Sequence, residues 1–209
     1  MLILIVVFGL ASVGFARYDY ANPPAGPSMS WAALAFFTCG SSVPSLAPSG
    51  GDFRALADGV VQSTTTGSPT LNQFTSAYPN LVLTSSTLQL PASGAKHPHA
   101  RIYQNNEKCA KGTKDAGKVG HVEIAYWLTL ESSKPTLTTN PSSVPLSSRV
   151  QISVAFLPTG VTPPRPPAAV ISAMGVAIVN GATATSTTTT TLGVTPTSTV
   201  TPTTATPKH

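Results

Sequence analysis

Basic side chains concentrate between residues 96 and 118 of this 209-residue chain. The cluster consists of Lys96, Arg101, Lys108, Lys111, Lys114 and Lys118, which is half of the 12 lysines and arginines. Only two acidic residues, Glu107 and Asp115, oppose it, and the formal net charge of the chain is +5. Such a cluster suits non-specific contacts with the phosphates of a nucleic acid. The alternative is a solvated lysine-rich loop, because no RNA-recognition motif and no interleaved aromatic residues accompany the charges.

Residues that could perform catalysis are sparse. The 7 acidic residues are dispersed, and the chain contains no nucleophile elbow, Walker loop, H-E-x-x-H or G-x-G-x-x-G motif. His97 and His99 would share one face of a strand and could bind a metal, but a single His-x-His pair in a basic loop is more often solvated. We therefore expect no enzymatic activity.

The chain contains two cysteines, Cys39 and Cys109. They could form a disulfide, which would imply an oxidising compartment. They could equally be two buried free thiols. No Cys-x-x-Cys or Cys/His spacing indicates a zinc site.

These residues must be positioned by a β-rich scaffold. From Val122 to Leu130 apolar residues alternate strictly with other residues, which predicts a strand with one apolar face. Gly117 precedes this strand and Lys134-Pro135 follows it. A similar alternation from Val150 to Phe156 predicts a second strand.

The remaining segments have weaker patterns. Short strands are expected over residues 81–84, 87–90 and 100–104, a short helix over 31–37, and a polyproline linker over 162–167. Residues 170–179 are apolar and strand-like, and no amphipathic helix is long enough for an α/β fold. The sequence therefore predicts an all-β fold, an antiparallel β-sandwich, with an extended carboxyl-terminal arm.

Both ends of the chain are unusual in composition. Met1–Ala16 is a continuous apolar run that we read first as buried strands, second as a signal peptide and third as a pilin-type helix. It is shorter than the roughly 20 residues of a membrane span. From Ala182 the tail is rich in threonine and proline, and as a free segment it would be disordered or glycosylated. Because threonine favours extended structure, the tail could instead lie as an ordered arm along a neighbouring subunit. Overall only 9% of residues are charged, against roughly 25% in typical soluble domains, which fits surfaces covered by neighbouring copies.

Two segments resemble the shell domain of small icosahedral positive-strand RNA viruses of the tombusvirus, sobemovirus and nodavirus type. In Val13–Leu34, an aromatic-Asp-aromatic strand end is followed by a proline-rich turn and a short helix. In Val119–Pro135, a glycine precedes alternating apolar residues, a tyrosine and a leucine shortly before a proline. The chain departs from these coats in having no basic amino-terminal arm and in beginning where their third or fourth strand is expected.

The resemblance implies a jelly-roll coat protein that assembles with many copies of itself around RNA in a virion. It implies a shell domain over residues 1–135, a linker with additional strands over 136–180 and a Thr/Pro-rich arm over 181–209. In related coats acidic residues bind calcium between subunits; Asp19 matches, but Asn22 stands where a second acid would help, and no other cofactor is expected. The alternative is an extracellular or cell-surface filament or wall subunit, and a third possibility is a secreted hydrolase or binding module.

Overall fold

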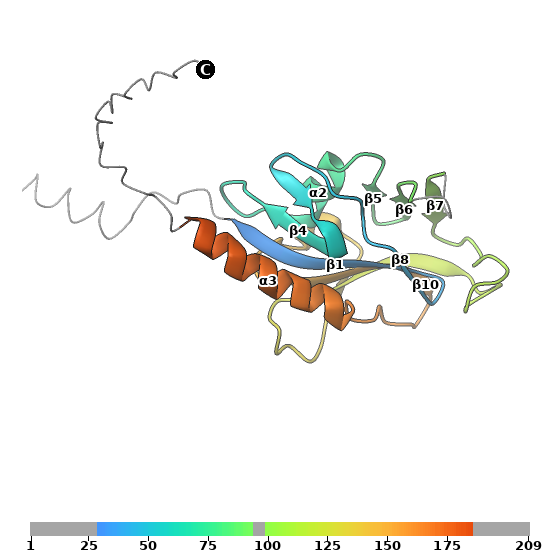
Figure 1. Cartoon of the computed structure of the whole chain (residues 1–209). Helices are drawn as coiled ribbons and strands as arrows, with labels where there is room; N and C mark the ends of the chain where they lie inside the picture. Colours follow the sequence, from blue (N-terminus) through green and yellow to red (C-terminus); the bar gives the residue numbers. More distant parts are fainter. Residues whose placement is uncertain (1–28, 94–98, 186–209) are drawn as a thin grey trace, which may run out of the picture.

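The computed structural model describes residues 29–93 and 99–185. The strands are β1 (Ser30–Thr38), β2 (Ser41–Val43), β3 (Phe53–Ala55), β4 (Val60–Ser63), β5 (Val82–Leu83), β6 (Thr87–Leu90), β7 (Arg101–Gln104), β8 (Gly120–Trp127), β9 (Thr136–Thr138) and β10 (Gln151–Pro158). The helices are α2 (Leu71–Ala77) and α3 (Ala168–Thr185), with short 3-10 turns at Ala57–Gly59 and Pro141–Ser143. The β-rich prediction is confirmed, and most strand pairs are antiparallel (Figure 1).

A seven-stranded sheet forms the centre of the domain. Its order is β3-β4-β1-β10-β8-β9, with β2 also paired to β1. The pair β1–β10 is parallel, from Ala33 opposite Gln151 to Thr38 opposite Phe156. β10 also pairs antiparallel with β8 along its full length. The sheet contains strands from both sides of residue 135, because β10, which follows this residue, pairs with β1 and β8, which precede it.

The main core lies on one face of this sheet. There, alternate side chains of the central strands, such as Phe36, Ile124 and Val154, are buried against α2 and against the small sheet β5-β6-β7. Phe74 of α2 is fully buried in this core. Figure 1 shows α2 and the small sheet on one side of the large sheet and α3 on the other.

The second face of the sheet is covered by α3 and by the linker before it. Met174 and Val170 of α3 pack with Ala33 and Val60 of the sheet. In the linker, Pro163 and Pro166 are buried, as the three-residue repeat of a polyproline segment allows. Arg165 lies over the Trp127 ring, with the guanidinium carbon 5.5 Å from the ring centre, and donates to Gln151 Oε1 over 2.6 Å. The expected linker is thus a packed part of the domain.

Two sequence predictions were wrong in type. Residues 31–37, expected as a helix, belong to β1. Because β1 lies at the centre of the sheet and both of its faces are covered, it is apolar without alternation and resembles a helix in composition. Residues 170–179, expected as strand-like, belong to α3, where Val170, Met174 and Ile178 recur at intervals of four residues. The helix expected from the resemblance after the proline-rich turn is likewise a strand.

The stronger alternation patterns predicted strands correctly. The expected strands over 81–84, 87–90, 100–104 and 150–156 appear as β5, β6, β7 and β10. The strand expected over 122–130 appears as β8 but ends at Trp127, and Leu128 and Leu130 beyond it are 53% and 41% exposed. Here the chain turns, and the turn is held by bonds from Gln151 Nε2 to Thr129 O (3.1 Å) and from Arg165 Nη2 to Leu130 O (2.8 Å). The structures expected for Met1–Ala16 and for the tail from residue 186 lie outside the described residues.

Candidate nucleic-acid interface

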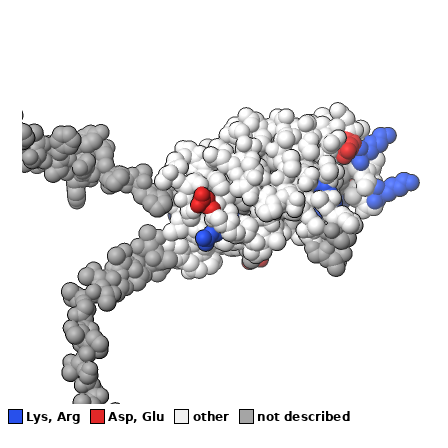
Figure 2. All heavy atoms as spheres, turned by 90° about the horizontal axis from the view of Figure 1, so that it is seen from above, with Lys and Arg blue, Asp and Glu red and all other residues white. Residues whose placement is uncertain are grey.

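Four of the predicted basic residues lie together on the loop between β7 and β8, residues 105–119, which we call the lysine loop. Lys108, Lys111, Lys114 and Lys118 are all exposed on it. The loop projects at one end of the domain (Figure 1), and basic side chains extend from the same end in Figure 2. Lys96 lies outside the described residues. Arg101 differs from the four lysines, because it lies in β7 and its Nε and Nη2 atoms are buried.

The lysine loop is held in place by its own backbone. Cys109 N donates to Lys118 O and Gly117 N donates to Cys109 O, both over 2.9 Å. The loop also packs against the turn after β1, where Asp115 N donates to Cys39 O over 3.3 Å. Gly40 in that turn has a φ of 79°, and a Cβ there would lie 2.7 Å from Asp115 Oδ2. Glycine therefore permits both the turn and the close approach of the loop.

A disulfide joins this loop to the central strand. Cys39, just after β1, is bonded to Cys109 of the loop, with their Cα atoms 5.6 Å apart and a separation of 70 positions in sequence. Both residues are buried. Of the two alternatives left by the sequence, the structure has the disulfide, and the lysines consequently lie on a cross-linked loop.

The charges on the loop are only partly compensated. Lys118 Nζ lies 2.9 Å from Asp115 Oδ1, and Glu107 Oε2 accepts from Gln104 N over 3.0 Å. Four lysines against these two acids leave a net charge of +2 on the loop. Among the described residues, Lys108, Lys111 and Lys114 have no acidic partner within salt-bridge distance.

This arrangement suits contacts with phosphate and not with bases. Lysine presents a compact charge that binds phosphate without fixed geometry. Base recognition in single-stranded nucleic acid relies on stacking against aromatic side chains, and residues 105–119 contain none. The nearest aromatic residue in the sequence, Tyr103, instead packs against Phe156, with ring centres 5.2 Å apart.

The other predicted sites gain no support from the geometry. Asp19, the residue suggested for calcium, lies outside the described residues, as does His97. Within residues 29–93 and 99–185 no group of three or more histidine, cysteine or acidic side chains is arranged to hold a metal ion. None of the helices in these ranges has the length and hydropathy needed to cross a bilayer.

Comparisons with protein-family models, with curated proteins and with solved structures find no match to this chain. The resemblance to viral coats therefore depends on the two quoted segments alone. Of these, Val119–Pro135 coincides with β8 and the turn after it, whereas Val13–Leu34 is described only from residue 29.

The position of Arg101 does not follow from its place in the sequence, where it lies within one span with the lysines. The period of a strand gives a better signal, since Arg101 and Tyr103 are two residues apart and Tyr103 packs on the core. Residues on that face of β7 point inward, and the guanidinium of Arg101 lines a pocket with two of its nitrogens buried.

Proposed function

We propose that this chain is a structural subunit that assembles with copies of itself, in its most specific form as the coat of an RNA-containing shell. The observation that supports this best is the surface of α3. None of its 18 residues is charged. One side of the helix packs on the sheet, and on the other side Gly175, Val176 and Asn180 are exposed, Val176 by 61%. A helix without charge on any side is typical of a helix that is covered on all sides.

The opposite side of the domain is also poor in charge. Figure 2 shows few charged side chains over the middle of this side; basic side chains project from the end with the lysine loop, and an acidic and a basic side chain lie near the other end. Exposed apolar side chains occur there, including Val82 and Ile102. Surfaces of this kind favour burial against a neighbouring subunit over solvation.

The lysine loop supports the RNA part of the proposal. Three lysines at one end of a charge-poor domain have no acidic partner among the described residues. They would be the region that faces nucleic acid in a shell, and such a shell would place the chain in a virion. A jelly roll is an antiparallel architecture, whereas β1 and β10 are parallel. The proposal therefore depends on the surface of the domain and not on jelly-roll topology.

A second candidate is a subunit of an extracellular or cell-surface assembly. The disulfide favours it, because such bonds persist mainly in oxidising compartments. The start of β1 and the end of α3 also lie together, since a Cβ on Gly181 would be 2.5 Å from the Trp31 ring. Both segments that flank the domain consequently leave it near one end, as suits a domain displayed on a support.

Electron microscopy of the full chain in negative stain, with the 260/280 nm absorbance ratio of the same fraction, separates these functions. Closed particles with nucleic-acid absorbance would support the shell. Filaments or sheets without nucleic acid would favour the surface assembly. Dispersed monomers at high protein concentration would contradict both.

Binding of single-stranded RNA tests the lysine loop directly. Three phosphate contacts predict that affinity falls about a hundredfold for a tenfold rise in salt. The double variant Lys111→Gln/Lys114→Gln should weaken binding and flatten this dependence. The control Arg54→Gln/Lys134→Gln removes the same charge from exposed positions outside the loop. Equal loss of affinity in both variants would show that only the net charge matters.

A further inference from the structure

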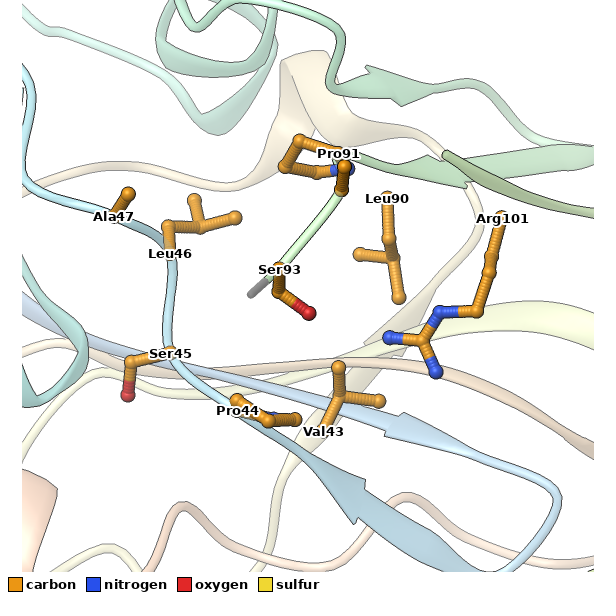
Figure 3. A pocket seen from close by; sticks show the side chains of 10 residues that line it. Val43, Pro44, Ser45, Leu46, Ala47, Leu90, Pro91, Ser93 and Arg101 are labelled. Atoms are coloured by element: carbon orange, nitrogen blue, oxygen red, sulfur yellow. The ribbon is translucent and has the colours of Figure 1, made fainter. Parts of the chain in front are cut away.

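A pocket of about 270 Å³ lies between the segment after β2 and the end of β6, with β7 forming one wall (Figure 3). Most of its described lining residues are apolar, among them Val43, Leu46 and Leu90, and the polar ones are Ser45, Ser93 and Arg101. In Figure 3 the guanidinium of Arg101 and the hydroxyl of Ser93 both point toward the middle of this space.

Among the described residues, Arg101 is the only charged residue in this lining, and none of them carries an acidic group within salt-bridge distance of it. Its Nε and Nη2 atoms are buried and, in the described part of the chain, donate no hydrogen bond. The Ser93 Oγ atom is also buried and has no hydrogen-bond partner there. Residues 94–98, which follow Ser93, contain no acidic residue. Arg165 provides a contrast within the same chain, because its Nε and Nη2 donate to Gln151 Oε1 and Leu130 O over 2.6 and 2.8 Å.

An unpaired buried guanidinium is unfavourable unless an anion pairs with it. The Nε–H and Nη2–H bonds of an arginine project side by side, and their spacing matches the two oxygens of a carboxylate. The Ser93 hydroxyl supplies a third donor beside them. The apolar walls would exclude a small, strongly hydrated anion and would favour a hydrocarbon body attached to the charge.

The pocket is also held in shape. Arg101 pairs with Leu90 in the register of β6 and β7, which fixes one wall relative to the other. Across the pocket, the Tyr78 hydroxyl donates to Ala47 O over 2.8 Å and anchors the segment after β2. A site with rigid walls loses little freedom when a ligand binds.

We propose that this pocket binds a small organic monocarboxylate, with the carboxylate on Arg101 and Ser93 and the hydrocarbon body against Val43, Leu46 and Leu90. This inference does not depend on the proposed function, since either a shell or a surface subunit could bind such a molecule. The carboxylate belongs to a free ligand and not to a side chain of another copy.

Titration of the full chain with octanoate, followed by calorimetry and thermal unfolding, tests the proposal. Octanoate should raise the Tm of the wild-type protein. 1-Octanol, which has the same hydrocarbon chain without the charge, and inorganic phosphate, which has charge without hydrocarbon, should each bind at least about tenfold more weakly. Arg101→Met should weaken octanoate binding by a similar factor and Ser93→Ala by less, while Arg54→Met, at an exposed arginine, should leave it unchanged.

The free protein provides a readout that needs no ligand. Because Arg101→Met replaces an unpaired buried charge by an apolar side chain of similar length, its Tm without ligand should equal or exceed that of the wild type. Equal affinity for octanoate and 1-octanol, or octanoate binding that survives Arg101→Met, would overturn the proposal. A third result would also overturn it: a wild-type Tm that rises with protein concentration but not with octanoate, together with no such rise in Arg101→Met. A second copy of the chain would then supply the anion. If Arg101→Met does not fold, Arg101→Lys provides a second test, because it keeps the charge and loses the paired donors. Arg101→Lys should bind octanoate more weakly than the wild type, and equal binding would reject the site.

Discussion

At the scale of single residues, Gly120 shows how closely β8 packs against its neighbour. It is buried opposite Pro158 of β10, and a Cβ at this position would lie 2.4 Å from the Phe156 ring. Phe156 is itself buried and in contact with Tyr103, so it has little room to move. We expect Gly120→Ala to lower the free energy of unfolding by about 1–3 kcal/mol, measured by urea denaturation.

Gly175 provides the matched control. It lies within α3, and a Cβ there would meet no atom within 4 Å. Gly175→Ala should therefore raise the free energy of unfolding by roughly 0.5–1 kcal/mol, because alanine restricts the unfolded chain and favours a helix. If both variants change the free energy of unfolding in the same direction, the contact with the Phe156 ring does not restrict the size of the side chain at residue 120.

Tyr78 should make stability depend on pH in the alkaline range. Burial raises the pKa of its phenol above the ordinary value of 10.0. As pH rises past 10, the unfolded chain loses this proton first, so the stability due to Tyr78 is complete below pH 10 and declines as pH approaches the folded pKa. Ionisation would also remove the proton that the hydroxyl donates to Ala47 O.

We therefore expect Tyr78→Phe to be less stable than the wild type by about 0.5–1.5 kcal/mol near neutral pH, and this difference should shrink above pH 10. Urea midpoints of both proteins between pH 7 and 11 measure it, and the comparison cancels the titration of all other groups. If the difference in stability stays constant to pH 11, folding does not raise the pKa of the Tyr78 phenol.

At the scale of elements, the disulfide determines how firmly the lysine loop is attached to β1. It closes a loop of 70 residues, so its removal should lower the free energy of unfolding by about 2–4 kcal/mol. The double variant Cys39→Ala/Cys109→Ala should show this loss, and the wild type should show it on addition of a reducing agent. Intact mass should rise by two hydrogen atoms on reduction of the wild type and remain constant in the variant. If the reducing agent leaves the unfolding midpoint of the wild type unchanged, the disulfide does not stabilise the fold.

Local pattern predicted the strands whose two faces differ in residue type, and it failed where the two faces are alike. β8 and β10 alternate because large apolar residues lie on the core side and smaller or polar residues are frequent on the other, although all residues of β10 are buried. β1 is covered on both sides, by the core and by α3, so its apolar run gave no period. The residues of α3 are small and uncharged on every side, which hides the four-residue recurrence of Val170, Met174 and Ile178.

The candidate site was partly predictable for a related reason. A run of lysines within one loop stays together however the loop folds, so sequence spacing placed Lys108, Lys111, Lys114 and Lys118 correctly in one region. The pocket around Arg101 brings together segments near residues 45, 91 and 101, and their proximity arises from strand pairing that no local pattern contains. The parallel pairing of β1 with β10, more than a hundred residues apart, is equally non-local.

At the scale of the whole molecule, the domain is polarised. The start of β1 and the end of α3 lie near one end and the lysine loop lies at the other (Figure 1). Between these ends, α3 has no charged residue, and the side seen in Figure 2 shows few charged side chains. A molecule of this kind has two different ends and sides that carry little charge. Lateral contact between copies would align the lysine loops on one surface of the assembly, and a sheet or shell made in this way would have one basic surface.

This arrangement predicts that a charge on the outer side of α3 blocks assembly without unfolding the domain. Val176 is 61% exposed, so Val176→Glu should leave the unfolding midpoint nearly unchanged. Burying the new carboxylate against another copy would carry a large penalty, and self-association measured by sedimentation velocity should fall at least about tenfold. Val119→Glu places the same change at a 44% exposed valine on the lysine loop, away from the lateral surface, and should associate like the wild type. Because the two variants have equal net charge, a loss of association in both would show that the effect does not depend on a contact through α3. A loss in Val119→Glu alone would place the contact at the loop end and reject lateral assembly through α3.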